Sequence, residues 1–403
     1  MLSVAEAREL ILASVKPTGV EWVALPQAPG RVLASDLRAE RDPPPAAGSA
    51  MAGDAVGAAD TSEPERRFRV VAEAVPGAPP APALGPGEAV RIFTGGAIPP
   101  GADAVVVQEE ATPDAEGVRF AAKVAPGTFV RPAGLDFARG WVGLAAGSLL
   151  DARALGLATA LGAAWLPVRC RPRVGVLATG NELRWPGAPA TASQIHSSNS
   201  VTLITMLAAW GAEPVNLGLC PDEGDALATR LGSAAGLDLL VTTGGASVGD
   251  HDLVQRVLGR AGMRVDFWKI AMRPGKPLIH GHVGDVPLLG FPGNPVSTAV
   301  CAILFLRAAL QQMLGLPVHL RHRAAVLLNP LEPNDRREDY LRARYAEAGG
   351  RSGVRTAGRQ DSSMFATFAH ADVLLVRPQF DPARAPGESL PSIDIHNALD
   401  NLR

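Results

Sequence analysis

The chain of 403 residues lacks features that mark several large classes of protein. Its cysteines are Cys170, Cys220 and Cys301, an odd and widely spaced set, so we expect neither a disulfide framework nor a zinc site. Aromatic residues make up 5% of the chain and the formal net charge is −2, which leaves few stacking platforms and no basic field for nucleic acid. These absences predict a protein of a reducing, cytoplasmic compartment without a nucleic-acid partner.

Sequences that target or anchor a protein are missing as well. The first residues, MLSVAEARELILASV, form an amphipathic pattern with acidic residues and predict a helix rather than a signal peptide. The most apolar long segment, 296–310, contains Arg307 and is too short to span a bilayer, so it predicts a buried helix and no membrane partner. The chain has no Walker A sequence and its histidines lack partner spacing, which argues against nucleoside triphosphate hydrolysis and against a Ser/His/Asp triad.

The pattern of apolar residues changes along the chain and predicts several domains, since single domains usually hold about 100–200 residues. Short β runs separated by glycine and proline give way near residue 172 to alternating strands and helices, and short strands return after Pro317. We predict an α/β fold class with four parts: a mixed α+β linker region (1–45 and 135–170), an inserted small β domain (46–134), a doubly wound, mainly parallel α/β domain (171–316) and a C-terminal β domain (317–403).

The most informative stretch is TTGGASVGD, residues 242–250, which follows an apolar run that predicts a buried parallel strand. A glycine-rich turn between a strand and a helix leaves backbone N–H groups free at the helix start, where the helix dipole also favours an anion. Gly244 and Gly245 let the backbone approach a phosphate closely, and Ser247 adds a hydroxyl donor. The alternative is an ordinary turn capped by Ser247 or Asp250.

Carboxylates stand beside this anion-binding turn, at Asp250 and Asp252. A site that combines phosphate-binding donors with carboxylates usually holds a metal ion between the two kinds of group. The stretch therefore predicts a phosphate-and-metal site at the carboxyl end of a strand.

Three further loops follow predicted strands of the same α/β region. LATGNEL (177–183) offers Thr179 and Gly180 for close approach of a ligand and Glu182 as a hydrogen-bond acceptor or metal ligand. KIAMRPGKPL (269–278) presents two cations on a Pro-Gly turn, which suits phosphate or an oxyanion such as molybdate. FPGNPVS (291–297) opens the apolar helix with donors from its asparagine and serine. Each of these loops also has a plain structural interpretation as a cap, a solvated turn or a connection.

A fourth segment, IHSSNS (195–200), opens the helix after the LATGNEL loop. Its residues Ser197, Ser198 and Asn199 are good N-cap residues, and we favour capping over ligand binding for them.

At these loops the chain resembles the MoeA family, the molybdopterin molybdenumtransferases related to the gephyrin E domain. The resemblance covers almost the whole chain and rests on five motifs in the same order and spacing: IFTGGAIPPGADAVVVQEE (92–110), TGNEL (179–183), TTGGASVGDHD (242–252), RPGKP (273–277) and FPGNPVS (291–297).

The resemblance implies insertion of molybdate into adenylylated molybdopterin with release of AMP, assisted by Mg²⁺. It implies a homodimer in which the linker region takes part, and molybdopterin adenylyltransferase and molybdoenzyme recipients as further partners. The acidic positions carried over as catalytic are Asp136, Glu182, Asp222 and Asp252, with Asp222 and Asp252 as metal ligands. The positions assigned to the pterin substrate and the oxyanion are Thr179, Gly180, Ser198, Asn199, Gly244, Gly245, Ser247, Gly249, Arg273, Lys276, Pro292, Gly293, Asn294, Ser297, Arg342 and Ser362.

The chain departs from the family pattern after its proline linker. Where the family has roughly DNSAMDGYAV, this sequence has AGSAMAGDAV, so Ala52 stands at an acidic position and Asp54 at the tyrosine position. An alanine cannot ligate a metal or take a proton, whereas Asp54 lies two residues further on the same side of an extended segment, about 6–7 Å away. We therefore add Asp54 to the candidate catalytic residues.

The sequence leaves three hypotheses open. The first is a molybdenumtransferase in which Asp54 compensates for Ala52 or turnover is reduced. The second is a catalytically weakened protein that binds or hands over the cofactor without making it. The third is a broader relative that acts on another phosphorylated pterin or nucleotide.

Overall fold

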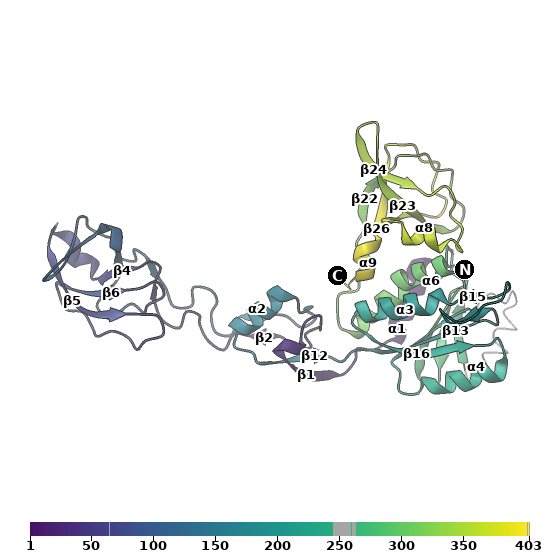
Figure 1. Cartoon of the computed structure of the whole chain (residues 1–403), viewed down its shortest axis with the longest axis horizontal. Coiled ribbons are helices and arrows are strands. Elements are labelled where there is room, and N and C mark those ends of the chain that lie inside the picture. Colours follow the sequence, from purple (N-terminus) through teal and green to yellow (C-terminus); the bar gives the residue numbers. More distant parts are fainter. Residues whose placement is uncertain (64, 245–258, 260–262, 401, 403) are drawn as a thin grey trace. The chain divides into compact units, whose positions relative to one another are not determined.

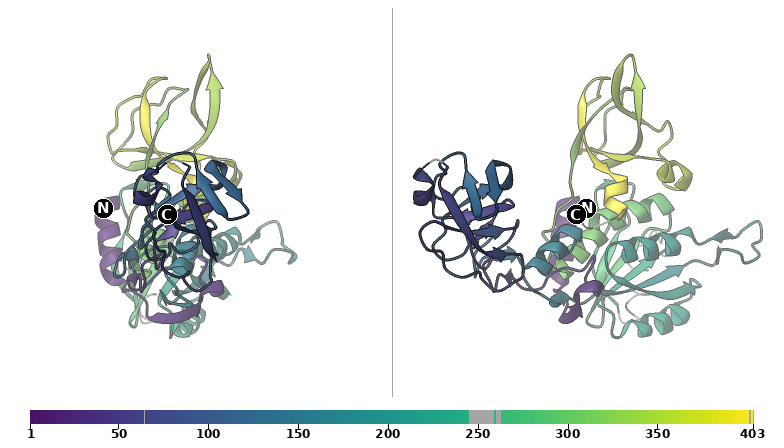
Figure 2. Two further views of the ribbon diagram at one scale, coloured as in Figure 1. Left: turned by 90° about the vertical axis from the view of Figure 1, so that its left-hand side faces the viewer. Right: turned by 60° about the vertical axis from the view of Figure 1, so that its left-hand side comes forward.

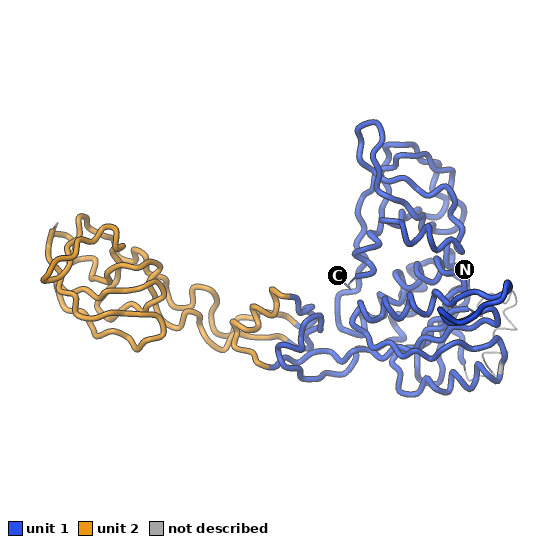
Figure 3. The backbone as a smooth tube through the Cα atoms, viewed as in Figure 1, with its two compact units in different colours: residues 1–35, 146–151, 165–403 blue, residues 36–145, 152–164 orange. Residues whose placement is uncertain are grey.

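A computed structural model of the chain describes residues 1–63, 65–244, 259, 263–400 and 402. The described residues form two compact units, which Figure 3 colours separately. Unit 1 contains residues 1–35, 146–151 and 165–403, and unit 2 contains residues 36–145 and 152–164. The predicted four-part division into domains stays a prediction.

The centre of unit 1 is a six-stranded sheet in the order β16-β13-β17-β21-β20-β18. Neighbours among the first four strands are parallel, whereas β20 pairs antiparallel with both β21 and β18. The strands are β13 (Arg173–Thr179), β16 (Glu213–Cys220), β17 (Leu239–Thr243), β18 (Met263–Trp268), β20 (Ile279–Val283) and β21 (Val286–Phe291). The buried strands are rich in branched apolar residues, as expected for a parallel sheet covered on both faces.

Helices cover both faces of this sheet, as Figures 1 and 2 show. One core joins the sheet to α3 and to the long apolar helix, and a second core joins the other face to α4. The helices are α1 (Val4–Ser14), α3 (Ser198–Ala209), α4 (Gly224–Leu231) and the continuous run of α6 (Pro295–Cys301), the π-helical η5 (Ala302–Leu306) and α7 (Arg307–Met313). The prediction of a doubly wound, mainly parallel α/β domain is confirmed.

The apolar helix from Pro295 to Met313 is long and apolar enough to span a membrane by length and composition alone, but nearly all of it is buried inside the structure. Its one charged side chain, Arg307, is also buried and donates a hydrogen bond from Nη1 to the carbonyl oxygen of His319 at 2.9 Å. The prediction of a buried core helix at this segment is confirmed.

The end of the chain forms a second sheet of unit 1, in the order β19-β23-β25-β26-β22, with β24 paired to β23. Its strands are β19 (Met272–Arg273), β22 (Arg323–Val326), β23 (Glu338–Ala348), β24 (Arg351–Thr356), β25 (Val373–Arg377) and β26 (Ser389–Asp394). The helix α8 (Phe365–Ala369) lies between β24 and β25, and α9 (Ile395–Asp400) follows β26. Because β19 lies on the segment that links β18 to β20, the α/β sheet and the C-terminal sheet are tied together by the chain itself. Two more strands of unit 1, β1 (Val20–Ala24) and β12 (Trp165–Arg169), pair with each other.

Unit 2 is built around a six-stranded sheet in the order β7-β4-β6-β5-β9-β8. Its strands are β4 (Gly53–Val56), β5 (Arg67–Ala74), β6 (Glu88–Ile92), β7 (Ala104–Val107), β8 (Ala111–Asp114) and β9 (Gly117–Phe120). Shorter pairs join β2 (Leu37–Arg38) to β11 (Val142–Leu144) and β3 (Gly48–Ser49) to β10 (Val130–Arg131), and α2 (Ala152–Ala160) packs beside β11. The β-rich character predicted for this part of the chain is present.

A buried histidine joins α1 to the edge of the α/β sheet. His280 on β20 places Nε2 at 3.0 Å from Ser14 Oγ and Nδ1 at 3.5 Å from Asp266 Oδ2. Burial lowers the pKa of His280 to about 4, so the ring is neutral near pH 7. Ser14 is far in the sequence from Asp266 and His280, and these two lie on different strands, β18 and β20. The sequence spacing therefore did not predict that the three side chains meet.

We expect His280 to make the protein less stable in acid. The unfolded histidine takes up a proton near pH 6.5 whereas the folded one resists protonation down to about pH 4, so stability falls as the pH drops through this window, by up to about 3 kcal/mol. The variant His280→Gln keeps a donor for Ser14 Oγ. Its free energy of unfolding, measured with urea at a series of pH values, should lack the loss of stability that protonation of His280 causes. The exposed His322→Gln serves as control, and equal pH slopes for wild type and His280→Gln would contradict the assignment.

Candidate functional site

The carboxyl ends of β13 and β17 meet where the strand order reverses, which is the usual ligand-binding edge of an open α/β sheet. β13 ends at Thr179, and Gly244 follows β17 directly. Gly244 has φ +93°, and a Cβ there would lie 2.0 Å from the carbonyl oxygen of Thr179. Only glycine allows this backbone approach, so Gly244 fixes how closely the two loops lie together.

The loop after β21 is fastened to the same edge. Asn199, near the start of α3, donates hydrogen bonds from Nδ2 to Thr243 Oγ1 and to the carbonyl oxygen of Gly293, both at 2.8 Å. Thr243 Oγ1 in turn donates to the carbonyl oxygen of Pro292 at 3.1 Å. These bonds bring Asn199, Pro292 and Gly293 to the ends of β17 and β21.

The predicted N-caps behave differently from the expectation. Ser197 is the N-cap residue of α3 by position, yet its side chain makes no capping bond and instead pairs with Ser200 Oγ at 2.9 Å. Ser198 is exposed in the first turn. The side chain of Asn199 is used by the loops at the sheet edge, because these lie within its reach in the folded chain.

The segment between β24 and α8 contributes to the same loops. Asn294 Nδ2 donates to Ser362 Oγ at 2.8 Å, and the backbone N–H of Val296 donates to the carbonyl oxygen of Ser362 at 3.1 Å. Ser297, in the first turn of α6, is 4% exposed. Asn294, Ser297 and Ser362 therefore lie together, although Ser362 is far from the other two in the sequence.

Two acidic residues lie beside Thr179. The side chain of Glu182 packs against Gly180, and the backbone N–H of Asp222 donates to Asn181 Oδ1 at 3.2 Å. Desolvation of its carboxyl raises the pKa of Asp222, and the charge of Glu182 raises it further. The nearby Thr179 hydroxyl lowers the pKa of Asp222. This hydroxyl is buried, and its distances and angles to the described residues do not meet those of a hydrogen bond.

The two cations of the RPGKP loop have different surroundings. Arg273 Nε donates to Asp339 Oδ1 at 2.8 Å, its Nη2 pairs with the same carboxylate, and Asp335 Oδ2 lies 3.7 Å from its Nη1. The ammonium group of Lys276 has no hydrogen bond or ion pair among the described residues, although its backbone carbonyl oxygen accepts the N–H of Ile270. Arg273 is thus engaged by the carboxylates of Asp335 and Asp339, whereas the Lys276 ammonium group is not. Ligand binding by either cation stays a prediction.

Arg342 on β23 is buried, with 1% of its surface exposed. Its Nη2 donates to the carbonyl oxygen of Asp361 at 2.9 Å, whereas its Nε has no partner among the described residues. Gln360 binds the backbone of Arg342 at both its N–H and its carbonyl oxygen. Arg342 is thus held firmly next to the Asp361–Ser362 turn.

Asp136 and Asp54 belong to unit 2. The Asp54 carboxylate is 3% exposed, lies 3.7 Å from Arg91 Nη1 and has its pKa raised by desolvation, against the lowering effect of Arg91. Ala52 precedes the strand and its carbonyl oxygen accepts the backbone N–H of Gln108. The catalytic role of Asp54 stays a prediction, and so does that of Asp136.

Several predicted site residues fall outside the described part of the chain, namely Gly245, Ser247, Gly249, Asp250 and Asp252. Among the described residues no group of three or more His, Cys, Asp or Glu side chains is arranged to hold a metal ion. Of the two predicted metal ligands, Asp222 and Asp252, Asp222 lies in the described part of the chain, and its metal binding stays a prediction.

Sequence reasoning missed the residues that hold the loops in place. Thr243 and Thr298 hydroxyls both donate to the carbonyl oxygen of Pro292, and Asn181 anchors Asp222. The double threonine at the end of β17 was the available signal, since a threonine at a strand end with a buried side chain needs a partner.

We predict that Glu182→Gln lowers the pKa of Asp222, because the variant removes a like charge beside it. Carbon-13 NMR of aspartate-labelled protein measures this pKa, and the resonance lost in Asp222→Asn identifies the signal. Glu213→Gln, at the opposite end of β16, should leave the titration unchanged. An unaltered Asp222 titration in Glu182→Gln would show that the two carboxylates do not interact.

Comparison with known proteins places the chain beside one group of sequences. Three family models match it: the MoeA N-terminal region (domain I and II) over residues 2–162, a probable molybdopterin binding domain over 175–312 and the MoeA C-terminal region (domain IV) over 324–395.

Full-length relatives agree with these matches. Molybdopterin molybdenumtransferase 2 of Mycobacterium tuberculosis is 37% identical over 85% of this chain and 87% of its own. Molybdopterin molybdenumtransferase of Haemophilus influenzae is 32% identical over 97% and 98%. A crystal structure of the molybdopterin biosynthesis MoeA protein from Pyrococcus horikoshii is 26% identical, with a TM-score of 0.83 over 98% of this chain and 100% of that one.

Proposed function

Because this chain belongs to the MoeA family of molybdopterin molybdenumtransferases, we propose that it inserts molybdenum into molybdopterin in the biosynthesis of the molybdenum cofactor. The substrates are molybdate and adenylylated molybdopterin, and AMP leaves. The observation that carries the proposal is the edge where Thr179, Gly244 and Asn294 meet, since it combines close backbone approach with hydrogen-bond donors at the switch point of the sheet.

The residue types at this edge suit the parts of the substrate. A phosphate-linked nucleotide needs backbone N–H groups and a cation, which the loops after β17 and β21 and Lys276 can offer. Molybdate is an oxyanion, and Lys276, Ser297 and Arg342 are the donors we assign to it. Arg273 acts in our proposal mainly by holding the RPGKP loop against Asp339.

The described residues fit a bound Mg²⁺. This ion usually takes one or two protein carboxylates and completes its coordination with water and substrate phosphates. Glu182 and Asp222 supply two carboxylates, the charge of Glu182 being one cause of the raised pKa of Asp222, and Asp252 is the predicted third. When bound, the ion would neutralise phosphate charge while the adenylate leaves.

The remaining expectations from the family stay proposals for this chain. We propose a homodimer in which the linker region takes part, a cytoplasmic location, and exchange of intermediates with molybdopterin adenylyltransferase and with molybdoenzyme recipients.

The direct test is AMP release and reconstitution of an apo-molybdoenzyme by the purified protein with adenylylated molybdopterin, molybdate and Mg²⁺. We expect Lys276→Gln to lower kcat/KM about 10- to 100-fold, since a charge-assisted hydrogen bond to an anion is lost. The exposed Lys123→Gln of unit 2 removes the same charge and should leave turnover unchanged. Absence of cofactor formation by wild type under conditions in which a family member works would reject the proposal.

A second experiment addresses the substituted acidic position. We expect Asp54→Asn to lower turnover about tenfold or more without lowering the melting temperature, because a neutral side chain costs less to bury and Arg91 keeps the Gln108 side chain and the Gly53 carbonyl oxygen as acceptors. Ala52→Asp should then change turnover little. A large gain of turnover in Ala52→Asp with no loss of turnover in Asp54→Asn would show that Asp54 does not replace the acidic residue absent at position 52.

A further inference from the structure

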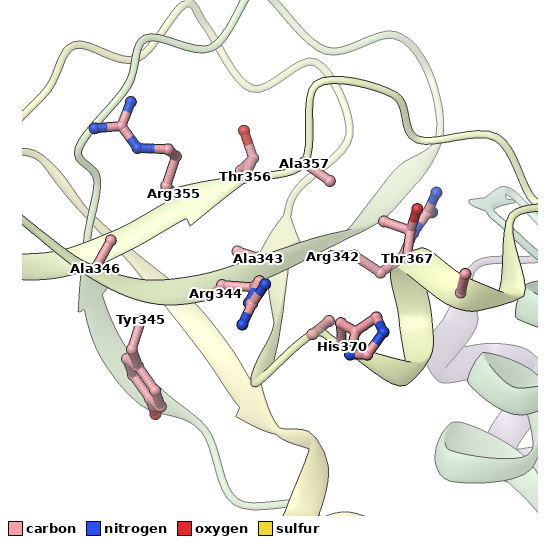
Figure 4. A pocket seen from close by; sticks show the side chains of 12 residues that line it. Arg342, Ala343, Arg344, Tyr345, Ala346, Arg355, Thr356, Ala357, Thr367 and His370 are labelled. Atoms are coloured by element: carbon pink, nitrogen blue, oxygen red, sulfur yellow. The ribbon is translucent and has the colours of Figure 1, made fainter.

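A pocket of about 550 Å³ opens on the C-terminal sheet, between β23, β24 and α8 (Figure 4). Twelve residues line it, and none of them is acidic. The side chains that can carry positive charge there are Arg342, Arg344, Arg355 and His370. A cavity with this lining attracts anions and repels metal ions.

Two of these arginines face each other across neighbouring strands. Arg344 on β23 is the register partner of Arg355 on β24, so the two side chains leave the same face of the sheet. Like charges in directly opposite positions destabilise a strand pair. Neither guanidinium has a hydrogen bond or ion pair among the described residues, although exposed arginines elsewhere in the chain, such as Arg67 and Arg69, are paired with carboxylates.

The deep wall of the pocket carries a third, unsatisfied guanidinium. Arg342 lies two residues before Arg344 on the same strand, is 1% exposed and leaves Nε without an acceptor among the described residues. Its guanidinium makes no ion pair among the described residues and donates one hydrogen bond there, to the carbonyl oxygen of Asp361. A buried charge without a counter-ion is costly, and a bound anion would remove that cost.

We propose that this pocket binds a phosphate ester or anhydride. Guanidinium groups match phosphate oxygens in pairs, and three of them around one cavity suit a group with more charge and more acceptor oxygens than a single carboxylate. Thr367 and His370 on the α8 side add further hydrogen-bonding groups. Arg344, Arg355 and His370 have no part in the proposed transferase site, whereas Arg342, which we assign to molybdate there, also lines this pocket. The proposal therefore rests on Arg344 and Arg355, and it does not depend on the transferase reaction.

Isothermal titration of the full-length protein with pyrophosphate, with AMP and with inorganic phosphate tests the proposal. We expect Arg344→Gln and Arg355→Gln each to weaken the affinity for the preferred probe about tenfold or more, and the double variant to weaken it further. Arg351→Gln removes the same charge from the first residue of β24, which does not line the pocket, and should change affinity less than twofold. The order of the three probes tells whether an anhydride, a nucleotide monophosphate or the bare anion is preferred.

Thermal unfolding supplies a second readout. Without a ligand, Arg355→Gln should match or exceed the wild-type melting temperature, because it relieves the repulsion with Arg344. With pyrophosphate, wild type and Arg351→Gln should gain stability, and Arg355→Gln should gain much less.

The variant Lys276→Gln distinguishes binding in the pocket from binding at the proposed transferase site. In that variant the part of pyrophosphate binding that depends on Arg344 and Arg355 should persist. Equal affinities in the pocket variants and in Arg351→Gln would overturn the proposal, and so would binding that Lys276→Gln alone abolishes. An acidic hexapeptide that binds as tightly as pyrophosphate would also overturn it, because the pocket would then select carboxylates.

Discussion

The parallel pairing of β13 with β17 is the contact on which the rest of the site depends. The pairing brings Thr179 next to Gly244, and the absence of a side chain at Gly244 lets two backbones come into contact there. From this point Asn199 and Thr243 hold the loop after β21, and Asn294 carries the connection on to Ser362, in the segment between β24 and α8. A short series of hydrogen bonds thus joins four distant segments at one sheet edge.

Charge is distributed unevenly around this framework. At the sheet edge, desolvation and the charge of Glu182 raise the pKa of Asp222. The side chains of Lys276 and Arg342 form no ion pair with a carboxylate among the described residues. Such opposed, incompletely neutralised groups are typical of sites that complete their electrostatics with a ligand. An anionic substrate and a divalent cation together would satisfy both sides, which is the chemistry of a molybdenumtransferase acting on a nucleotide-linked pterin.

Much of the α/β fold was readable in advance, because alternating apolar runs and helical patterns are local properties. The change to alternating strands and helices near residue 172 and the buried helix from residue 296 both appear close to their expected places. The side-chain partners were less accessible. Ser197 looked like an N-cap and pairs with Ser200 instead, and Arg273 looked free but is engaged by Asp339, a residue on another sheet. Hydrogen bonds between distant segments have no periodicity in the sequence.

The sequence by itself determined the succession of strands and helices, the positions of the glycine turns and the family to which the chain belongs, since each of these depends on the order and spacing of neighbouring residues. Only the tertiary structure decided which charges are neutralised. Folding buried Asp54 beside Arg91 and placed His280 between Ser14 and Asp266. It also placed Arg344 opposite Arg355 in a pocket that no acidic residue lines. The reason is physical: the energy of a charge depends on burial and on partners within a few ångströms, and both are settled when distant segments pack together.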